Sequence, residues 1–99
     1  MVDKKVALVT GAGRGLGEAV AVDLLSKDMY VVIADIHKID INKYNNNSEL
    51  NCSENIMSHQ VDVSNRLEVK EMFNLALKKF RKIDYLINFA GINRDSPFI

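Results

Sequence analysis

The sequence predicts an α/β fold in which a parallel sheet carries helices on both faces. Two continuous apolar runs, residues 6–10 and 30–34, alternate with segments of helical periodicity. Apolar runs rich in β-branched residues are typical of strands buried on both faces, as in parallel sheets. The first run stops at a glycine cluster, which marks a turn from strand to helix. We expect one domain in this chain of 99 residues, with right-handed crossovers between its strands.

The elements are expected in the order β-α-β-α-β-α-β. The first helix begins in the glycine cluster and ends near residues 27–28. A short helix is expected over 38–46 and a loop over 47–54, in a segment rich in asparagine. Asparagine forms helices poorly and favours turns. A third strand is expected at 56–61, and a fourth at 85–89 after the third helix.

Apolar spacing predicts which helix faces pack on the sheet. The third helix is expected to start at a capping box, with Asn65 as the cap and Glu68 as the third helical residue. Apolar residues that recur every three or four positions form a stripe on one helix face. The predicted stripes are Leu16, Ala19, Val20 and Leu24 in the first helix, and Val69, Met72, Phe73, Ala76 and Phe80 in the third.

Composition excludes several classes of partner. The 13 basic and 13 acidic side chains cancel, so we expect no binding to nucleic acid or to an anionic membrane. Cys52 is the only cysteine, and His37 and His59 lack partners at ligand spacing, so we expect no disulfide and no metal site. The apolar run at 6–9 is too short for a signal peptide or a membrane span, which favours a cytoplasmic location.

The glycine cluster carries the main functional signal. Residues 10–17 have the sequence TGAGRGLG, a TGxxxGxG pattern between a predicted strand and a predicted helix. Gly11 permits a sharp turn, Gly15 leaves room for a pyrophosphate, and Gly17 lets the helix pack closely on the sheet. The unpaired amides of the helix start would face the phosphates. The alternative is a glycine-rich turn that binds no ligand.

Asp35 supplies the second signal, because it ends the second strand 18 residues after Gly17. A carboxylate at this position can accept hydrogen bonds from the ribose hydroxyls of an adenine dinucleotide. A 2′-phosphate would meet like charge there, which favours NAD over NADP as the cofactor. Arg14 favours NADP, because a guanidinium can pair with that phosphate. The alternatives are a solvated turn carboxylate for Asp35 and a solvent-directed side chain for Arg14.

Four segments of the chain resemble the classical short-chain dehydrogenases/reductases in order and spacing. They are TGAGRGLG at 10–17, VVIAD at 31–35, DV at 62–63 and NFAG at 88–91. The resemblance implies a Rossmann-type fold and hydride transfer between a nicotinamide cofactor and a carbonyl or alcohol. The segment IDYLINFAGINRD at 83–95 is similar to the 3-oxoacyl-acyl-carrier-protein reductase branch, which implies a 3-oxoacyl thioester substrate and fatty acid biosynthesis.

The resemblance also implies which residues bind the cofactor. The glycines would contact the phosphates, Asp35 the adenosine ribose, and Asp62 the exocyclic amine of adenine. Asn88, Ala90 and Gly91 would line the cofactor cleft and steady the fourth strand. The full expected set is Gly11, Gly13, Arg14, Gly15, Leu16, Gly17, Asp35, Ile36, Asp62, Val63, Asn88, Ala90 and Gly91.

Three positions depart from the family pattern. Phe89 replaces the second asparagine of the usual NNAG segment, whose amide helps to join the central strands. Asp28 and Arg81 stand where the family has a glycine after a helix, a position that often takes a left-handed conformation. Arg81 in that conformation costs roughly 1 kcal/mol. These departures indicate relaxed constraint or a different local path.

The catalytic residues of the family are not expected in this chain. The resemblance implies a serine after the fifth strand and a tyrosine four residues before a lysine, which lowers the pKa of the phenol. No lysine stands four positions after Tyr30, Tyr44 or Tyr85, and Ser96 comes too early in the strand order. Residues 1–99 are therefore expected to form an incomplete NAD(P)-binding domain, without its C-terminal catalytic half and inactive alone.

Three functions are open from the sequence. The first is a portion of an NAD(P)-dependent oxidoreductase whose full-length parent is a homo-oligomer. The second is a non-catalytic nucleotide-binding module that self-associates through the bare edge of its fourth strand. The third is an S-adenosylmethionine-type Rossmann protein, which is disfavoured because the TGxxxGxG loop suits a pyrophosphate.

Overall fold

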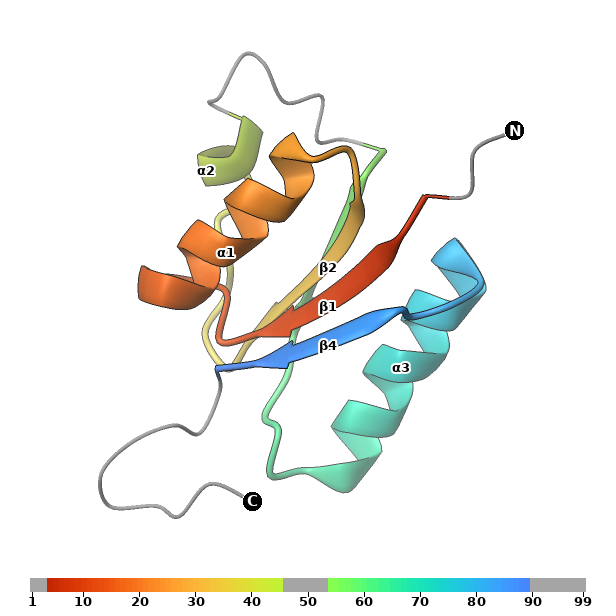
Figure 1. The fold of residues 1–99 in the computed structure, drawn as a ribbon. Helices are drawn as coiled ribbons and strands as arrows, with labels where there is room; N and C mark the ends of the chain where they lie inside the picture. Colours follow the sequence, from red (N-terminus) through yellow and green to blue (C-terminus); the bar gives the residue numbers. More distant parts are fainter. Residues whose placement is uncertain (1–3, 46–53, 90–99) are drawn as a thin grey trace.

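A computed structural model describes residues 4–45 and 54–89, which form a four-stranded parallel sheet with helices on both faces (Figure 1). The strands lie in the order β3-β2-β1-β4, which confirms the predicted fold. The elements are β1 (Val6–Thr10), α1 (Gly15–Ser26), β2 (Tyr30–Asp35), α2 (Asn42–Asn45), β3 (Ile56–Gln60), α3 (Arg66–Phe80) and β4 (Tyr85–Asn88). The third and fourth strands end one residue earlier than expected, and α2 is shorter than the helix expected over 38–46.

The two central strands separate two hydrophobic cores. Alternate side chains of a strand point to opposite faces, so Val9 and Ile33 enter the core beneath α1, whereas Leu8 and Val32 enter the core beneath α3. Figure 1 shows α1 and α2 on one face of the sheet and α3 on the other. Because both faces are covered, the whole of β1 is buried.

The strand register brings the carboxyl ends of the strands to one edge of the sheet. Thr10 of β1 pairs with Ala34 of β2 on one side and with Asn88 of β4 on the other. Asp35 pairs with Gln60 at the end of β3. The glycine cluster, Asp35 and the residues after β3 therefore share this edge, where open α/β sheets bind ligands.

The buried face of α1 differs from the predicted stripe. The buried residues of this helix are Gly17, Ala21 and Leu25, one position further along than predicted. Of the predicted stripe, Leu24 is half-buried and packs against the core, Val20 is half-buried, Ala19 is exposed and Leu16 is 59 % exposed. The cause is the packing of Gly17, because a Cβ there would lie 2.1 Å from the Gly11 carbonyl oxygen. This close approach fixes the rotation of the helix and turns Leu16 outward.

The predicted stripe and cap of α3 are confirmed. Met72, Ala76 and Phe80 are buried, with Val69 and Phe73 packed against them. The Asn65 side chain accepts the amides of Leu67 and Glu68, as in a capping box. Glu68 accepts the amide of Asp62 rather than that of the cap residue, at 3.1 Å. The cap thereby holds the segment that follows β3.

Both helix ends that depart from the family's glycine adopt the left-handed conformation. Asp28 has φ 62° and Arg81 has φ 76°. After α1, Met29 donates to the Leu24 carbonyl and Asp28 donates to Leu25, which is a Schellman motif. The chain therefore follows the path that glycine would favour, with a side chain present at each position.

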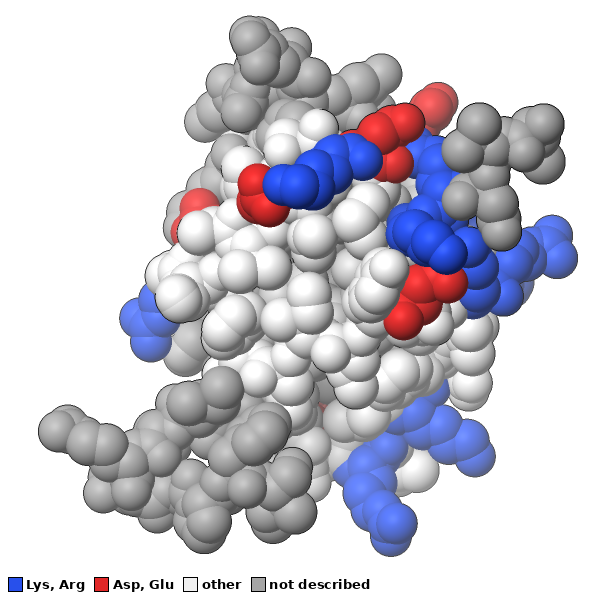
Figure 2. All heavy atoms as spheres, in the orientation of Figure 1, with Lys and Arg blue, Asp and Glu red and all other residues white. Residues whose placement is uncertain are grey.

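The outer edge of β4 is exposed. Tyr85 and Leu86 are 50 % and 56 % exposed, and β1 is the only described strand that pairs with β4. In Figure 2 the centre of the face seen is largely uncharged, and charged side chains gather toward its upper and right margins. The edge that was expected to be bare is therefore open within the described residues.

Candidate functional site

A pocket of about 890 Å³ lies at the carboxyl ends of the strands. Its volume falls within the range of about 300–1,000 Å³ that is typical of ligand and cofactor sites. It is formed by the glycine cluster, the end of β2, the segment after β3 and the residue after β4. The lining residues are Gly11, Arg14, Gly15, Leu16, Gly17, Asp35, Ile36, His37, Val61, Asp62, Val63, Ser64 and Phe89.

The glycine cluster turns the chain from β1 into α1. Gly11 and Gly15 both have positive φ, 69° and 64°, a conformation that side chains oppose. No atom would lie within 4 Å of a Cβ on Gly15, so the space beside it is open. Gly17 instead packs against the backbone of Gly11. Gly11 therefore permits the turn, Gly15 leaves open space, and Gly17 allows close packing.

The start of α1 presents backbone amides to the pocket. Arg14 is the N-cap residue, and its side chain makes no capping hydrogen bond. The first amides of a helix have no partner within the helix and lie at the positive end of its dipole. Gly15, Leu16 and Gly17 carry amides of this kind and line the pocket. This arrangement suits an anionic group such as a phosphate.

Asp35 ends β2 as a carboxylate with a donor on each oxygen. Oδ2 accepts the amide of Gly13 at 2.9 Å, and Oδ1 accepts the amide of His37 at 3.0 Å. Each carboxylate oxygen can accept two hydrogen bonds. With one bond made on each oxygen, one acceptor position remains on each. Two adjacent hydroxyl groups of a sugar match this pair of acceptors. Asp35 is thus held by two backbone amides, and its role toward a ligand stays a prediction.

Asp62 lies across the pocket, after β3. The Ser64 hydroxyl and amide donate to its Oδ1 at 2.7 and 2.9 Å, and these two bonds lower the pKa of the Asp62 carboxyl below its usual value. Glu68 fixes the Asp62 backbone from α3. Asp62 is therefore an ionised acceptor at neutral pH, and its Oδ2 is available for an amine of a ligand.

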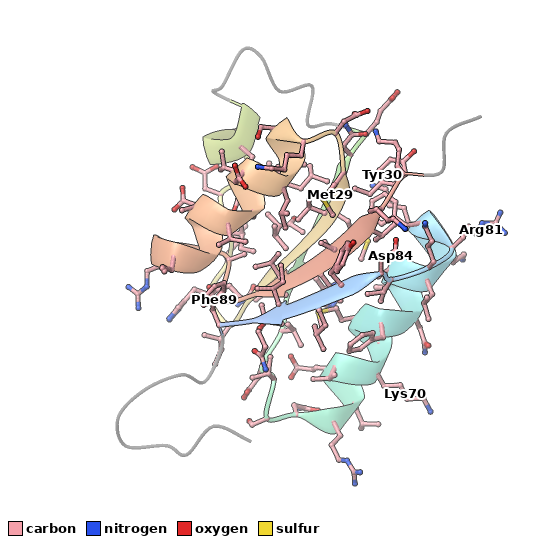
Figure 3. The ribbon with its side chains drawn as sticks, viewed as in Figure 1. Met29, Tyr30, Lys70, Arg81, Asp84 and Phe89 are labelled. Atoms are coloured by element: carbon pink, nitrogen blue, oxygen red, sulfur yellow. The ribbon has the colours of Figure 1, made fainter. Side chains whose placement is uncertain are left out.

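Phe89 replaces the expected second asparagine and forms one wall of the pocket. Figure 3 shows it at the end of β4, near the start of α1. Its amide donates to the Thr10 carbonyl at 3.1 Å, and the Thr10 hydroxyl donates to the side-chain oxygen of Asn88. These bonds join β4 to β1 at the pocket edge, and the aromatic ring adds apolar surface there.

The predicted site residues are distributed unevenly around the pocket. Gly13 and Asn88 lie outside its lining, where Gly13 bonds Asp35 and Asn88 bonds Thr10. Ala90 and Gly91 lie outside the described residues. The remaining nine predicted residues line the pocket, and their binding roles stay predictions. They are Gly11, Arg14, Gly15, Leu16, Gly17, Asp35, Ile36, Asp62 and Val63.

The sequence analysis missed four lining residues and one buried tyrosine. His37, Val61, Ser64 and Phe89 line the pocket beside predicted residues, and their adjacency to Asp35, Asp62 and Asn88 was the available signal. Tyr44 of α2 is 1 % exposed, and its hydroxyl donates to the Ala12 carbonyl at 2.7 Å. No motif indicated Tyr44, because it stands in the asparagine-rich segment far from the glycine cluster.

Comparison with known proteins identifies the family. The family model described as short chain dehydrogenase matches residues 5–99. The chain belongs to the short-chain dehydrogenase family. A 3-oxoacyl-[acyl-carrier-protein] reductase of Buchnera aphidicola is 36 % identical over 101 residues, which cover 97 % of this chain and 38 % of that protein. Short-chain dehydrogenases are oxidoreductases with an NAD(P)-binding Rossmann fold, and this chain has that fold.

Two solved structures share the fold. One from Bacillus anthracis is 28 % identical, with a TM-score of 0.79, and the match covers 90 % of this chain and 35 % of that one. A 3-ketoacyl-(acyl-carrier-protein) reductase from Brucella melitensis, complexed with NADH, is 33 % identical with a TM-score of 0.70. That match covers 83 % of this chain and 32 % of the reductase. The chain therefore spans about a third of the length of these relatives.

Two other kinds of feature, a membrane-spanning helix and a metal-binding cluster, are absent from the described residues. No helix among them is long and apolar enough to cross a membrane. Within residues 4–45 and 54–89, no group of three or more histidine, cysteine, aspartate or glutamate side chains could hold a metal ion. The pocket at the carboxyl ends of the strands, which nine of the predicted residues line, is the candidate site.

Proposed function

We propose that this chain binds the adenosine diphosphate part of NAD, as the cofactor-binding portion of an oxidoreductase. The observation that carries the proposal is the single pocket that joins the start of α1 with Asp35 and Asp62. Phosphate, ribose and adenine require three different kinds of contact. The pocket offers helix amides, a carboxylate with two acceptors and an ionised acceptor across from it.

The start of α1 is assigned to the pyrophosphate. Its amides line the pocket, the open space beside Gly15 admits a bulky anion, and the helix dipole favours negative charge. Arg14 is exposed at the same place and adds positive charge. S-adenosylmethionine has no phosphate and carries a positively charged sulfonium, so it does not complement the start of the helix as a dinucleotide does.

Asp35 and Asp62 are assigned to the adenosine. Asp35 accepts the ribose hydroxyls, and Asp62 accepts the exocyclic amine of adenine. A 2′-phosphate placed beside Asp35 would meet like charge, so NAD is favoured over NADP. Arg14 lines the same pocket, and its positive charge reduces this repulsion without removing the carboxylate.

The parent reaction is proposed as hydride transfer between the nicotinamide and a carbonyl or alcohol. The bound cofactor supplies the hydride chemistry. The relative named as a 3-oxoacyl-[acyl-carrier-protein] reductase points to 3-oxoacyl thioesters as a substrate class. None of Tyr30, Tyr44 and Tyr85 is followed by lysine four residues later, so the proposal assigns binding and not turnover to this chain. Purified chain should leave such thioesters unreduced.

Calorimetric titration with NAD, NADP and S-adenosylmethionine tests the proposal. Leu16→Glu is the informative variant, because Leu16 is the second residue of α1, lines the pocket and is 59 % exposed. Its control is Leu67→Glu, at the second residue of α3 and 79 % exposed, outside the pocket lining. A new negative charge near the pyrophosphate should weaken NAD binding by about tenfold.

The two variants separate the outcomes. Binding of NAD that falls in Leu16→Glu and persists in Leu67→Glu supports the assignment of the helix start. Equal loss in both variants, or preference for S-adenosylmethionine, contradicts it. Tight NAD binding without thioester reduction favours a nucleotide-binding module over a catalytic unit.

A further inference from the structure

The Ala12–Gly13 peptide is bonded at both of its polar ends. Its carbonyl oxygen, on Ala12, accepts the Tyr44 hydroxyl at 2.7 Å. Its amide, on Gly13, donates to Asp35 Oδ2 at 2.9 Å. Hydrogen bonds in such a chain polarise one another, so the bond to the carbonyl makes the amide a better donor. One peptide thus links a tyrosine of α2 to the carboxylate that ends β2.

Tyr44 is built into the fold at this point. Its side chain is 1 % exposed and belongs to the core beneath α1, which also contains Ala12 and Ile33. Burial, together with the nearby charges of Glu18 and Asp35, raises the pKa of the Tyr44 hydroxyl well above its usual range. The hydroxyl therefore keeps its proton and is a donor at neutral pH.

Ala12 is fixed on its other side as well. Its amide donates to the Ala34 carbonyl of β2 at 3.0 Å, and the residue is fully buried. Without the Tyr44 hydroxyl, the Ala12 carbonyl would lose its side-chain partner in a site that excludes water. A buried carbonyl without a partner carries a desolvation cost, and the peptide can lower that cost by rotating. Rotation would draw the Gly13 amide away from Asp35.

We propose that Tyr44 is a positioning residue for the dinucleotide site: through the Ala12–Gly13 peptide, its hydroxyl orients the Asp35 carboxylate toward the ribose. The inference rests on the proposed function, because it assumes that Asp35 binds the ribose. Tyr44 itself does not line the pocket. Its effect on the ligand is indirect, through the Ala12–Gly13 peptide and then the Asp35 carboxylate.

The test is Tyr44→Phe, which removes the hydroxyl and keeps the buried ring. The control is Tyr30→Phe, because Tyr30 begins β2 at the far end of the sheet and stacks on Phe80 with ring centroids 4.7 Å apart. NAD should bind about fivefold more weakly to Tyr44→Phe, the loss expected for one buried hydrogen bond. The affinity for NADP should fall by less, because NADP binding depends less on the acceptor oxygens of Asp35. A purely structural defect would weaken both dinucleotides equally.

A double-mutant cycle with Asp35→Ala adds a second readout. If Tyr44 acts through Asp35, then Tyr44→Phe changes NAD affinity by less than about twofold once the carboxylate is absent. If the two substitutions lower NAD affinity independently, so that their fold-changes multiply in the double variant, the proposal is overturned. Equal losses of NAD and NADP, or no loss of NAD, in the single variant would overturn it as well.

Amide hydrogen exchange at Gly13 tests the link without any ligand. In Tyr44→Phe the Gly13 amide should exchange at least about tenfold faster, because its bond to Asp35 loosens, and in Tyr30→Phe it should not change. Should the unsubstituted chain fail to bind NAD, the proposed function falls and this measurement alone decides the link. If Tyr44→Phe does not fold, exchange in the unsubstituted chain decides: a Gly13 amide as unprotected as an exposed loop amide overturns the proposal.

Discussion

The side chain of Asp35 and the backbone of Gly13 fit each other closely. The Gly13 amide donates to Asp35 Oδ2 at 2.9 Å, and a Cβ on Gly13 would lie 2.8 Å from that same oxygen. The second glycine of the cluster, Gly13, is therefore small because a carboxylate occupies the adjacent space. The acidic residue that ends β2 is thus a structural part of the glycine turn as well as a candidate ligand-binding group.

Gly13→Ala should displace the Asp35 carboxylate without unfolding the chain. Positive φ is recorded at Gly11 and Gly15 but not at Gly13, so the backbone accepts alanine there. The carboxylate must move, because it is the flexible partner of the clash. We expect NAD affinity to fall by about tenfold, which corresponds to the loss of about one charged hydrogen bond, with a small change in melting temperature. Calorimetric titration and thermal denaturation measure the two quantities.

Gly15→Ala is the matched control for this prediction. No atom would lie within 4 Å of the new Cβ, but the residue has φ 64°. Its cost in stability should be about 1 kcal/mol, and the Asp35 carboxylate should stay in place because the new Cβ would not reach it. The control readout is the position of Asp35 and not NAD affinity, since the space beside Gly15 is assigned to the pyrophosphate. A Gly13→Ala variant that keeps its NAD affinity would show that Asp35 is not held for the ligand.

Asp35→Asn should shift the dinucleotide preference toward NADP. The amide side chain keeps an oxygen that can accept from Gly13, but it removes the negative charge that opposes a 2′-phosphate. We expect the ratio of NAD affinity to NADP affinity to fall by about tenfold, or about 1.4 kcal/mol. Asp35→Ala also removes the hydrogen bond from the Gly13 amide, so it should weaken the binding of both NAD and NADP. An unchanged ratio in both variants would exclude Asp35 from the ribose site.

The strands and the cap of α3 could be predicted because their signals are local. The run at Val6–Thr10 is apolar at nearly every position, and Asn65 with Glu68 forms a recognisable cap pattern. The pocket followed from strand order, because parallel strands bring their carboxyl ends to one edge. Asp35 and Asp62 were found in this way although 26 other residues separate them.

The rotation of α1 and the role of Tyr44 could not be predicted, because each depends on a tertiary contact. Periodicity placed Leu16 in the core, but the approach of Gly17 to the Gly11 carbonyl turns it outward. Tyr44 bonds Ala12, 32 residues earlier, from a helix of four residues. Short polar segments carry little information about what they contact.

The stability of the chain should depend on pH through Asp84. Its carboxylate accepts the Val6 amide at 2.8 Å and pairs with Lys82 at 3.1 Å, and these contacts lower the pKa of Asp84 below its usual value. A lowered pKa in the folded state gives stability that is present above the unfolded pKa, about 3.9. That stability is lost as the pH falls through the lower pKa of the folded state.

Asp84→Asn isolates this charge, because asparagine can still accept the Val6 amide. Urea denaturation between pH 7 and pH 2.5 should show the unsubstituted chain more stable at neutral pH, with the difference shrinking below about pH 4. Two stability curves that stay parallel across this range would show that the Asp84 charge does not contribute.

Arg81→Gly should stabilise the chain. Arg81 ends α3 with φ 76°, its amide donates to the Leu77 carbonyl at 2.8 Å, and Figure 3 shows its side chain directed away from the fold. Glycine keeps the amide bond and removes the Cβ that opposes this conformation. We expect the free energy of unfolding to rise by about 1 kcal/mol, measured by urea denaturation.

Arg81→Ala separates backbone strain from the loss of charge. Alanine removes the guanidinium but keeps the Cβ, so it should leave the free energy of unfolding near that of the unsubstituted chain. Lys78 and Lys79 remain in the last turn of α3 and continue to oppose the negative end of the helix dipole. Equal stability of the glycine and alanine variants would mean that the left-handed residue carries no strain, and that the family's glycine at this position serves another purpose.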